Sequence, residues 1–164
     1  PQELINLSAA IERKAFESIS EMPMISRESV VNRSLSAVDS DTEFDIYSSS
    51  SPALNTESWP QSGAKIDCSG FIAWCFRTQR KISHPLYRKA NGGWFETSAL
   101  FKDGLEKSGY FTKTDQAKPG SLLVYPDKNG KHGHVGLVIE VNGEGVNGVV
   151  SVVHCSKGNF KRNG

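Results

Sequence analysis

Cys68 is the residue whose type and position best suit covalent chemistry. Apolar side chains recur over residues 68–76 at the three- and four-residue spacing of one helix face, so Cys68 falls in the first turn of a predicted helix. Unpaired backbone N–H groups and the positive end of the helix dipole meet there, which predicts a lowered thiol pKa and a reactive thiolate. The same N–H groups can donate to an oxyanion that forms on an attacked carbonyl. An inert buried cysteine, with Asp67 as the N-cap, is the alternative interpretation.

Two histidines supply candidate partners for that thiol. His134 begins, and His154 ends, an apolar segment with the character of a β-strand. Adjacent antiparallel strands can place two such side chains next to each other on one face. One imidazole can then accept the thiol proton while the second orients it; two ordinary strand histidines are the alternative. His132 shares the face of His134 only on a regular strand, and His84, which precedes a proline, suits a turn.

A zinc site is the competing use of Cys68, His134 and His154, because three protein ligands and a water form a catalytic zinc pattern. The sequence holds no Cys-x-x-Cys or His-Glu-x-x-His pair that would bring ligands together locally, so we expect no metal. Cys75 lies on the apolar stripe of the same helix and is expected in the core, and Cys155 is expected to face away from His154. Since the chain has three cysteines, at least one thiol is free or paired with another chain.

The elements before the cysteine divide into a helical part and a loop. Apolar residues at three- and four-residue spacing predict an amphipathic helix over 4–19 and a shorter one over 29–38. Residues 39–63 are rich in acidic residues and serine, and they predict a long exposed loop. We therefore expect one domain, made of an N-terminal helical segment (1–38), this loop and a catalytic core (64–164).

The elements after the cysteine change from helices to strands. A further helix is predicted over 94–107, after a turn that contains two glycines. Short apolar runs bounded by proline, glycine and asparagine then predict strands at 122–125, 135–141 and 149–154, joined in an antiparallel meander. The expected fold class is α+β, with N-terminal helices packed on an antiparallel sheet and the nucleophile at a helix N-terminus.

The composition limits the classes of function. The 164 residues carry 19 basic and 18 acidic side chains, which gives a formal net charge of +1. They include no clustered basic block of the kind that binds nucleic acid. No apolar run approaches the roughly 20 residues of a membrane span. The chain opens at Pro1 without the basic and apolar regions of a signal peptide, which leaves its compartment open.

The order of these motifs resembles the NlpC/P60 family of cysteine peptidases, which belongs to the papain-like superfamily. The resemblance covers roughly residues 65–156 and therefore most of the predicted core. Four segments carry it: Asp67-Cys68-Ser69-Gly70-Phe71 is similar to the family's nucleophile motif, Lys118–Tyr125 to its Pro-Gly strand, Gly133–Val138 to its His-Val-Gly strand, and Val153–Cys155 to its terminal strand.

The resemblance also implies roles for the site residues. Cys68 would be the nucleophile, His134 the general base, and His154 the third polar residue, which orients His134. The fold implied is a papain-like core of the NlpC/P60 type, with neither a metal nor an organic cofactor. Further residues near these motifs are expected to contact the substrate: Trp59, Asp67, Ser69 and Gly133.

The activity that the resemblance implies is hydrolysis of peptide bonds in bacterial cell-wall stem peptides. The bond would be the one between D-glutamate, through its γ-carboxyl, and a diamino acid. We accordingly expect a secreted, periplasmic or cell-wall-associated protein whose partner is the peptidoglycan stem peptide, with no nucleic acid and no membrane span. Two alternatives stay open: an interbacterial amidase toxin of the same superfamily, which an immunity protein would block, and a catalytically inactive wall-binding domain.

Overall fold

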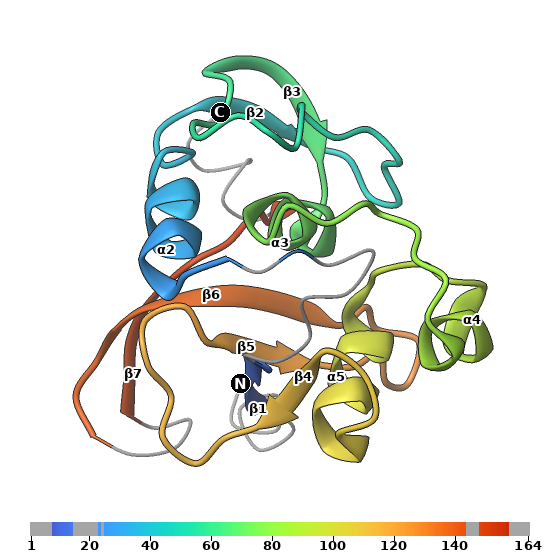
Figure 1. Ribbon diagram of the computed structural model, residues 1–164. Coiled ribbons are helices and arrows are strands. Elements are labelled where there is room, and N and C mark those ends of the chain that lie inside the picture. Colours follow the sequence, from blue (N-terminus) through green and yellow to red (C-terminus); the bar gives the residue numbers. More distant parts are fainter. Residues whose placement is uncertain (1–7, 15–22, 24, 144–147, 158–164) are drawn as a thin grey trace.

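The computed structural model of the chain describes residues 8–14, 23, 25–143 and 148–157. These residues form helices and strands of an α+β fold, which Figure 1 shows from one side. In chain order the elements are β1 (Ala9–Arg13), α2 (Arg27–Leu35), β2 (Asp41–Phe44), β3 (Ser62–Ile66), α3 (Cys68–Cys75), α4 (Pro85–Asn91), α5 (Thr97–Glu106), β4 (Phe111–Lys113), β5 (Leu122–Tyr125), β6 (His134–Val141) and β7 (Val149–Val153).

The larger sheet holds five strands in the order β4-β1-β5-β6-β7, and every neighbouring pair is antiparallel. The predicted meander is confirmed, because β5, β6 and β7 lie side by side in chain order. In the β5–β6 register Tyr125 is opposite His134. In the β6–β7 register Leu137 is opposite Val153, which brings the start of β6 close to the end of β7.

The helix predicted over 4–19 is wrong for Ala9–Arg13, which form strand β1 in the interior of the sheet. Ala9, Ala10 and Ile11 are buried between β4 and β5. A strand that is covered on both faces has a continuous apolar run, and a short run of this kind can also satisfy helical spacing. The remainder of the predicted helix, residues 4–7 and 15–19, lies outside the described residues.

The predicted loop over 39–63 also contains regular structure. Strand β2 lies within it and pairs in parallel with β3, which leads directly into the helix that begins at Cys68. In the Asp-Thr-Glu-Phe sequence of β2, Thr42 and Phe44 favour a strand but Asp41 and Glu43 do not, and half of the side chains are exposed. The local sequence signal is therefore weak, and pairing with β3 stabilises the strand.

The helices predicted over 29–38, 68–76 and 94–107 are confirmed as α2, α3 and α5, with shifted ends. The structure adds the short strand β4 and helix α4. Helix α4 begins at Pro85, a residue favoured at a first helical position, and His84 is its N-cap rather than a free turn residue. The His84 side chain accepts a hydrogen bond from the backbone N–H of Leu86 at 3.2 Å.

Helix α3 lies between the β2–β3 pair and the five-stranded sheet (Figure 1). Its residues after Cys68 are buried. Trp59 packs edge-on against Phe71 and Trp74, with ring centroids 5.3 and 4.9 Å apart, and Cys75 is fully buried as expected. This packing on several sides fixes the position of the helix start and therefore of Cys68.

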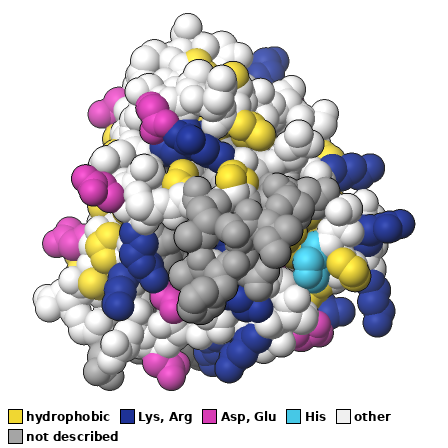
Figure 2. All heavy atoms as spheres, in the orientation of Figure 1, with side chains coloured by type: hydrophobic (Ala, Val, Ile, Leu, Met, Phe, Trp, Pro, Cys, Tyr) yellow, Lys and Arg dark blue, Asp and Glu magenta, His cyan; other side chains and the backbone are white. Residues whose placement is uncertain are grey.

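Basic and acidic side chains are interspersed over the face in Figure 2, in keeping with the near-neutral net charge of the sequence. Among the described residues, no helix combines the length and the apolar character needed to pass through a membrane.

Candidate active site

Cys68 is the first residue of α3, where the sequence predicted it. The helix begins at this point because Asp67 adopts an extended conformation and its Oδ1 accepts a hydrogen bond from the backbone N–H of Gly70 at 2.9 Å. The expected N-cap is therefore confirmed. Cys68 is half-buried, and its thiol is free.

Asp67 is held from a second side by Arg80. The guanidinium donates through Nη1 and Nη2 to the two carboxylate oxygens at 2.5 and 2.9 Å, and it also donates to Ser69 Oγ at 3.0 Å. Gly70 has no room for a side chain, because a Cβ there would meet the same guanidinium and Ile66. The tight packing around Gly70 thus comes from these two side chains, and it fixes the first turn of α3.

The four residues expected to contact substrate have largely internal roles in this structure. Asp67 and Ser69 are buried against Arg80, with exposed fractions of 5% and 3%. Trp59 is buried in the core, and its Nε1–H donates to a threonine hydroxyl at 2.7 Å. Gly133 is half-buried, and its backbone N–H donates to Asp127 at 2.5 Å. These residues shape the site from within.

His134 and His154 meet as the strand arrangement predicted. Nε2 of His134 and Nδ1 of His154 lie 2.6 Å apart, and the ring planes are 78° to one another with centroids 4.8 Å apart. A hydrogen bond of this length needs a proton on one nitrogen and a lone pair on the other. When His134 donates from Nε2, its Nδ1 is left as a proton acceptor.

The sulfur of Cys68 lies against the start of β6. The backbone N–H of Val135, the residue that follows His134, faces the Cys68 sulfur and lowers the pKa of its thiol. Helix α3 and strand β6 are in contact, so this arrangement is part of the main packing of the fold. The nucleophile candidate and the base candidate therefore occupy neighbouring positions on two packed elements.

The predicted low pKa of Cys68 is wrong for the free protein. Burial of the thiol, followed by the negative charge of Asp67, raises the pKa of Cys68 to about 11. The backbone N–H groups of Val135 and Ser69 lower the pKa of Cys68, but by less than burial and Asp67 raise it. A helix N-terminus therefore does not produce a thiolate here, because the site also removes water from the sulfur.

The pKa of His134 moves in the complementary direction. Burial of the imidazole, followed by the charge of His154, lowers the pKa of His134 to about 4. At neutral pH the resting site accordingly contains a Cys68 thiol and an uncharged His134 imidazole. An uncharged imidazole can take a proton, so this pair is set for general-base activation of the thiol.

Tyr125 is a site residue that the motifs did not identify. It is half-buried opposite His134, with ring centroids 6.2 Å apart, and burial followed by the charge of Cys68 raises the pKa of its phenol. Strand register could have identified Tyr125 from the sequence. In an antiparallel pair, the end of the predicted strand at 122–125 lies opposite the start of the strand of His134.

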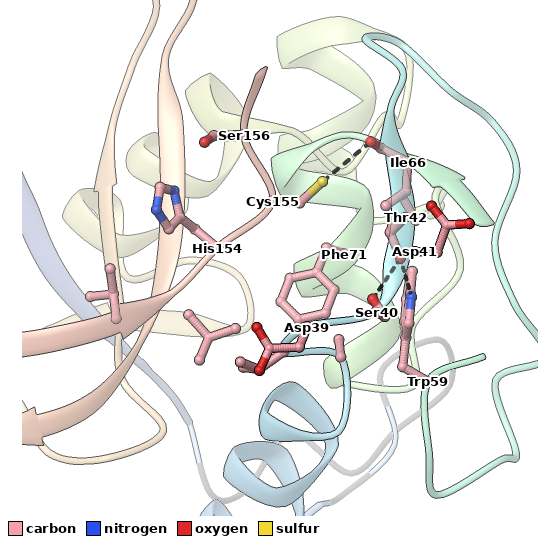
Figure 3. A pocket seen from close by; sticks show the side chains of 14 residues that line it. Asp39, Ser40, Asp41, Thr42, Trp59, Ile66, Phe71, His154, Cys155 and Ser156 are labelled. Atoms are coloured by element: carbon pink, nitrogen blue, oxygen red, sulfur yellow. Dashed lines mark hydrogen bonds between the residues drawn. The ribbon is translucent and has the colours of Figure 1, made fainter. Parts of the chain in front are cut away.

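A cavity of about 690 Å³ opens beside His154 (Figure 3). Its wall comes from the segment after α2, from Trp59 and Phe71, and from the residues that follow β7. Cys155 and His154 point in opposite directions, as expected, and the Cys155 thiol donates to the carbonyl of Ile66 at 3.4 Å. Cys68 and His134 do not line the cavity, so it adjoins the cluster rather than enclosing it.

The remaining titratable candidates lie apart from this cluster. His132 is exposed in the loop before β6 and contacts Tyr47 rather than His134. Within the described part of the chain, no group of three His, Cys, Asp or Glu side chains is placed to hold a metal ion.

Comparison with protein families matches residues 58–159, more than half of the chain, to the CHAP domain. The matched range contains Cys68, His134 and His154 together with α3 and the β5–β7 meander. No match was found among curated proteins, and none among solved structures.

Proposed function

The chain belongs to the CHAP family, and we propose that it uses Cys68 as the nucleophile of a peptidase or amidase that cleaves cell-wall stem peptides. CHAP domains are cysteine- and histidine-dependent amidases or peptidases of peptidoglycan, related to the NlpC/P60 and papain-like peptidases. The observation that carries the proposal is the 2.6 Å contact between His134 and His154. His134 begins β6, and the backbone N–H of the next residue, Val135, faces the Cys68 sulfur.

In the proposed reaction His134 is the general base. Its Nδ1 takes the proton of the Cys68 thiol as the sulfur forms a bond to the carbonyl carbon of the scissile amide. The backbone N–H of Cys68 donates to the oxyanion that results. His134 then gives its proton to the leaving nitrogen, the C–N bond breaks, and a thioester remains on Cys68.

The same groups then hydrolyse the thioester, with water in place of the thiol as the attacking group. His134 takes a proton from a water molecule, the water oxygen bonds to the acyl carbon, and the C–S bond breaks with return of the proton to sulfur. His154 accepts the Nε2–H hydrogen bond throughout and stabilises the charge that His134 carries between the two transfers. The products are a carboxylic acid and an amine.

The finer parts of the proposal follow the resemblance to NlpC/P60 peptidases. The bond would join the γ-carboxyl of D-glutamate to a diamino acid, the core would be papain-like, and the protein would act outside the cytoplasm on the wall. The elevated pKa of Cys68 fits a thiol that loses its proton only when the substrate is present.

The test is digestion of purified peptidoglycan and of isolated stem peptides, with products identified by mass spectrometry. We expect a new amine and a new carboxylate at one bond, and complete loss of both in Cys68→Ala. Cys155→Ser, which removes another half-buried thiol, serves as the matched control and should retain the activity. Binding to peptidoglycan without any cleavage by the unsubstituted protein would instead identify an inactive wall-binding domain.

A further inference from the structure

Residues 126–133 form the loop that joins β5 to β6. The tip of this loop is a tight turn at Asn129 and Gly130, which have positive φ values of 53° and 74°. Two backbone hydrogen bonds between Lys128 and Lys131, at 3.0 and 2.9 Å, close the turn. Asn-Gly with a positive φ at both positions is the pattern of a type I′ hairpin turn. The conformation of the tip therefore follows from its own sequence.

The part of the loop next to His134 is held by a side chain. Oδ1 of Asp127 accepts a hydrogen bond from the backbone N–H of Gly133 at 2.5 Å. Pro126, which directly follows β5, has no N–H to donate to a neighbouring strand, so the backbone ladder cannot be complete at this point. The Asp127 carboxylate supplies the acceptor for the N–H of the residue directly before His134.

Helix α5 holds Asp127 in turn. The Ser98 hydroxyl accepts a hydrogen bond from the backbone N–H of Asp127 at 3.2 Å, and the Thr97 hydroxyl donates to Asp127 Oδ1 at 3.4 Å. Thr97 and Ser98 belong to the first turn of α5, and Thr97 is only 5% exposed. A carboxylate beside this turn also lies near the positive end of the helix dipole. Asp127 is thus fixed at both its backbone and its side chain, although it is exposed.

Gly133 is packed closely against other parts of the chain. A Cβ at this position would lie 2.6 Å from Thr97 Oγ1 and 2.8 Å from the carbonyl carbon of Pro126, and it would also meet the carbonyl oxygen of Tyr125. The backbone of Gly133 therefore lies directly against the end of β5 and the start of α5. Together with the Asp127 carboxylate, these contacts enclose the main chain just before His134.

The position of that main chain matters for the chemistry of His134. In the proposed reaction the imidazole presents Nδ1 to the thiol, while its Nε2 lies 2.6 Å from His154. The next N–H along the chain, that of Val135, faces the Cys68 sulfur. A displacement of about 1 Å between reacting groups can cost about 100-fold in rate. The start of β6 therefore has to be held accurately for His134 to act as a base.

We propose that Asp127 is a positioning residue for His134, which acts through its hydrogen bond to the backbone N–H of Gly133. This inference rests on the proposed function and adds to it a residue that acts through another one. The carboxylate holds the start of β6 against α5, and this keeps the His134 imidazole between Cys68 and His154. A carboxylate suits the role, because a hydrogen bond to a charged acceptor is shorter and stronger than one to a neutral acceptor.

The test compares Asp127→Ala, which removes the acceptor, with Asp127→Asn, which keeps an oxygen in the same place. On isolated stem peptide, Asp127→Ala should lower kcat about tenfold and leave KM within about twofold, because the geometry lost is used in the transition state. Asp127→Asn should keep kcat within about threefold of the unsubstituted protein. Asp115→Ala, at another exposed aspartate in the loop between β4 and β5, is the matched control and should leave both constants unchanged.

Three results would overturn the proposal. A raised KM with an unchanged kcat in Asp127→Ala would make Asp127 a substrate contact. An equal loss of kcat in Asp127→Ala and Asp127→Asn would show that the charge matters and the hydrogen bond does not. Because Asp127 is exposed, Asp127→Ala should unfold within about 4 °C of the unsubstituted protein, and a much larger decrease would assign the residue a structural role instead.

A spectroscopic measurement separates this proposal from the proposed function. The nitrogen NMR shifts of histidine side chains show which ring nitrogen carries the proton, and they need no turnover. At neutral pH we expect a single tautomer of His134, protonated at Nε2, in the unsubstituted protein and in Asp127→Asn, and a mixture of both tautomers in Asp127→Ala. This result supports the positioning role even if the unsubstituted protein proves to have no hydrolase activity. An unchanged His134 tautomer in Asp127→Ala contradicts the role, whatever the activity.

Discussion

Arg80 and Asp67, the residue directly before the proposed nucleophile Cys68, form an ion pair whose two side chains are each only 7% exposed. The pair has the two-pronged geometry that a guanidinium and a carboxylate favour. One oxygen of the same carboxylate caps α3, and the other accepts from Tyr47. A single buried carboxylate thus joins the helix start, the turn that contains Tyr47 and the core.

Removal of Arg80 should destabilise the protein strongly. Arg80→Ala leaves the Asp67 carboxylate buried without its counter-ion, which costs about 3–5 kcal/mol of unfolding free energy. Urea denaturation followed by tryptophan fluorescence measures the change. Lys102→Ala, which breaks an exposed pair with Glu106, is the control and should cost less than about 1 kcal/mol. A loss of similar size in both variants would contradict the importance of the buried pair.

Substitutions of the two histidines should separate their roles. His134→Ala removes the proposed general base and should lower kcat/KM by about 10²–10⁴-fold. His154→Gln keeps an acceptor near Nε2 of His134 and should lower kcat/KM by only about 10–100-fold. Steady-state kinetics on isolated stem peptide gives both values. An equal loss in the two variants would mean that His154 itself transfers a proton.

As the pH is lowered, kcat/KM should not fall near the ordinary pKa of histidine. Burial, followed by the charge of His154, lowers the pKa of His134 to about 4, so the imidazole stays an uncharged base down to that pH. kcat/KM should therefore be level between about pH 5 and 8, provided the protein stays folded. In His154→Gln the charge of His154 is gone and the acid limb should move to higher pH. A half-loss near pH 6.5 in the unsubstituted protein would contradict this assignment.

Alkylation should report the protonation of the free thiol directly. Burial, followed by the charge of Asp67, raises the pKa of Cys68 to about 11, so the rate with iodoacetamide should still be rising above pH 9. Peptide mass spectrometry resolves the three cysteines, and Cys155, whose pKa burial raises to about 12, gives an internal comparison. A rate for Cys68 that is already level below about pH 7 would show a resting thiolate instead.

The part of the site that the sequence predicted rests on local patterns. The helical spacing after Cys68 and the short apolar run after His134 indicated the correct elements, and short antiparallel strands in chain order could be expected to bring His134 and His154 together. The helix start followed from Asp67, because N-capping depends on neighbouring residues alone. These features need no knowledge of distant packing.

The features that sequence reasoning missed depend on partners far along the chain. Ala9–Arg13 form a strand because β4 and β5 flank them, although their spacing also suited a helix. The pKa of Cys68 depends on burial, which a motif does not report. The contact between Tyr47 and His132 joins positions 85 residues apart, and nothing in either neighbourhood predicts it.

The position of β1 has a consequence for how the chain reaches its native state. An early segment of the chain fills the place between β4 and β5, so the middle of the sheet must wait for residues that a ribosome makes much later. Pairing of such distant segments slows folding, because the entropy of closing a long loop is lost before the contacts form. The two histidines also come from the late segments. A partly synthesised chain that stops before β6 therefore has the Cys68 thiol but neither histidine, and the proposed catalytic cluster is complete only after β7 and His154 have been made.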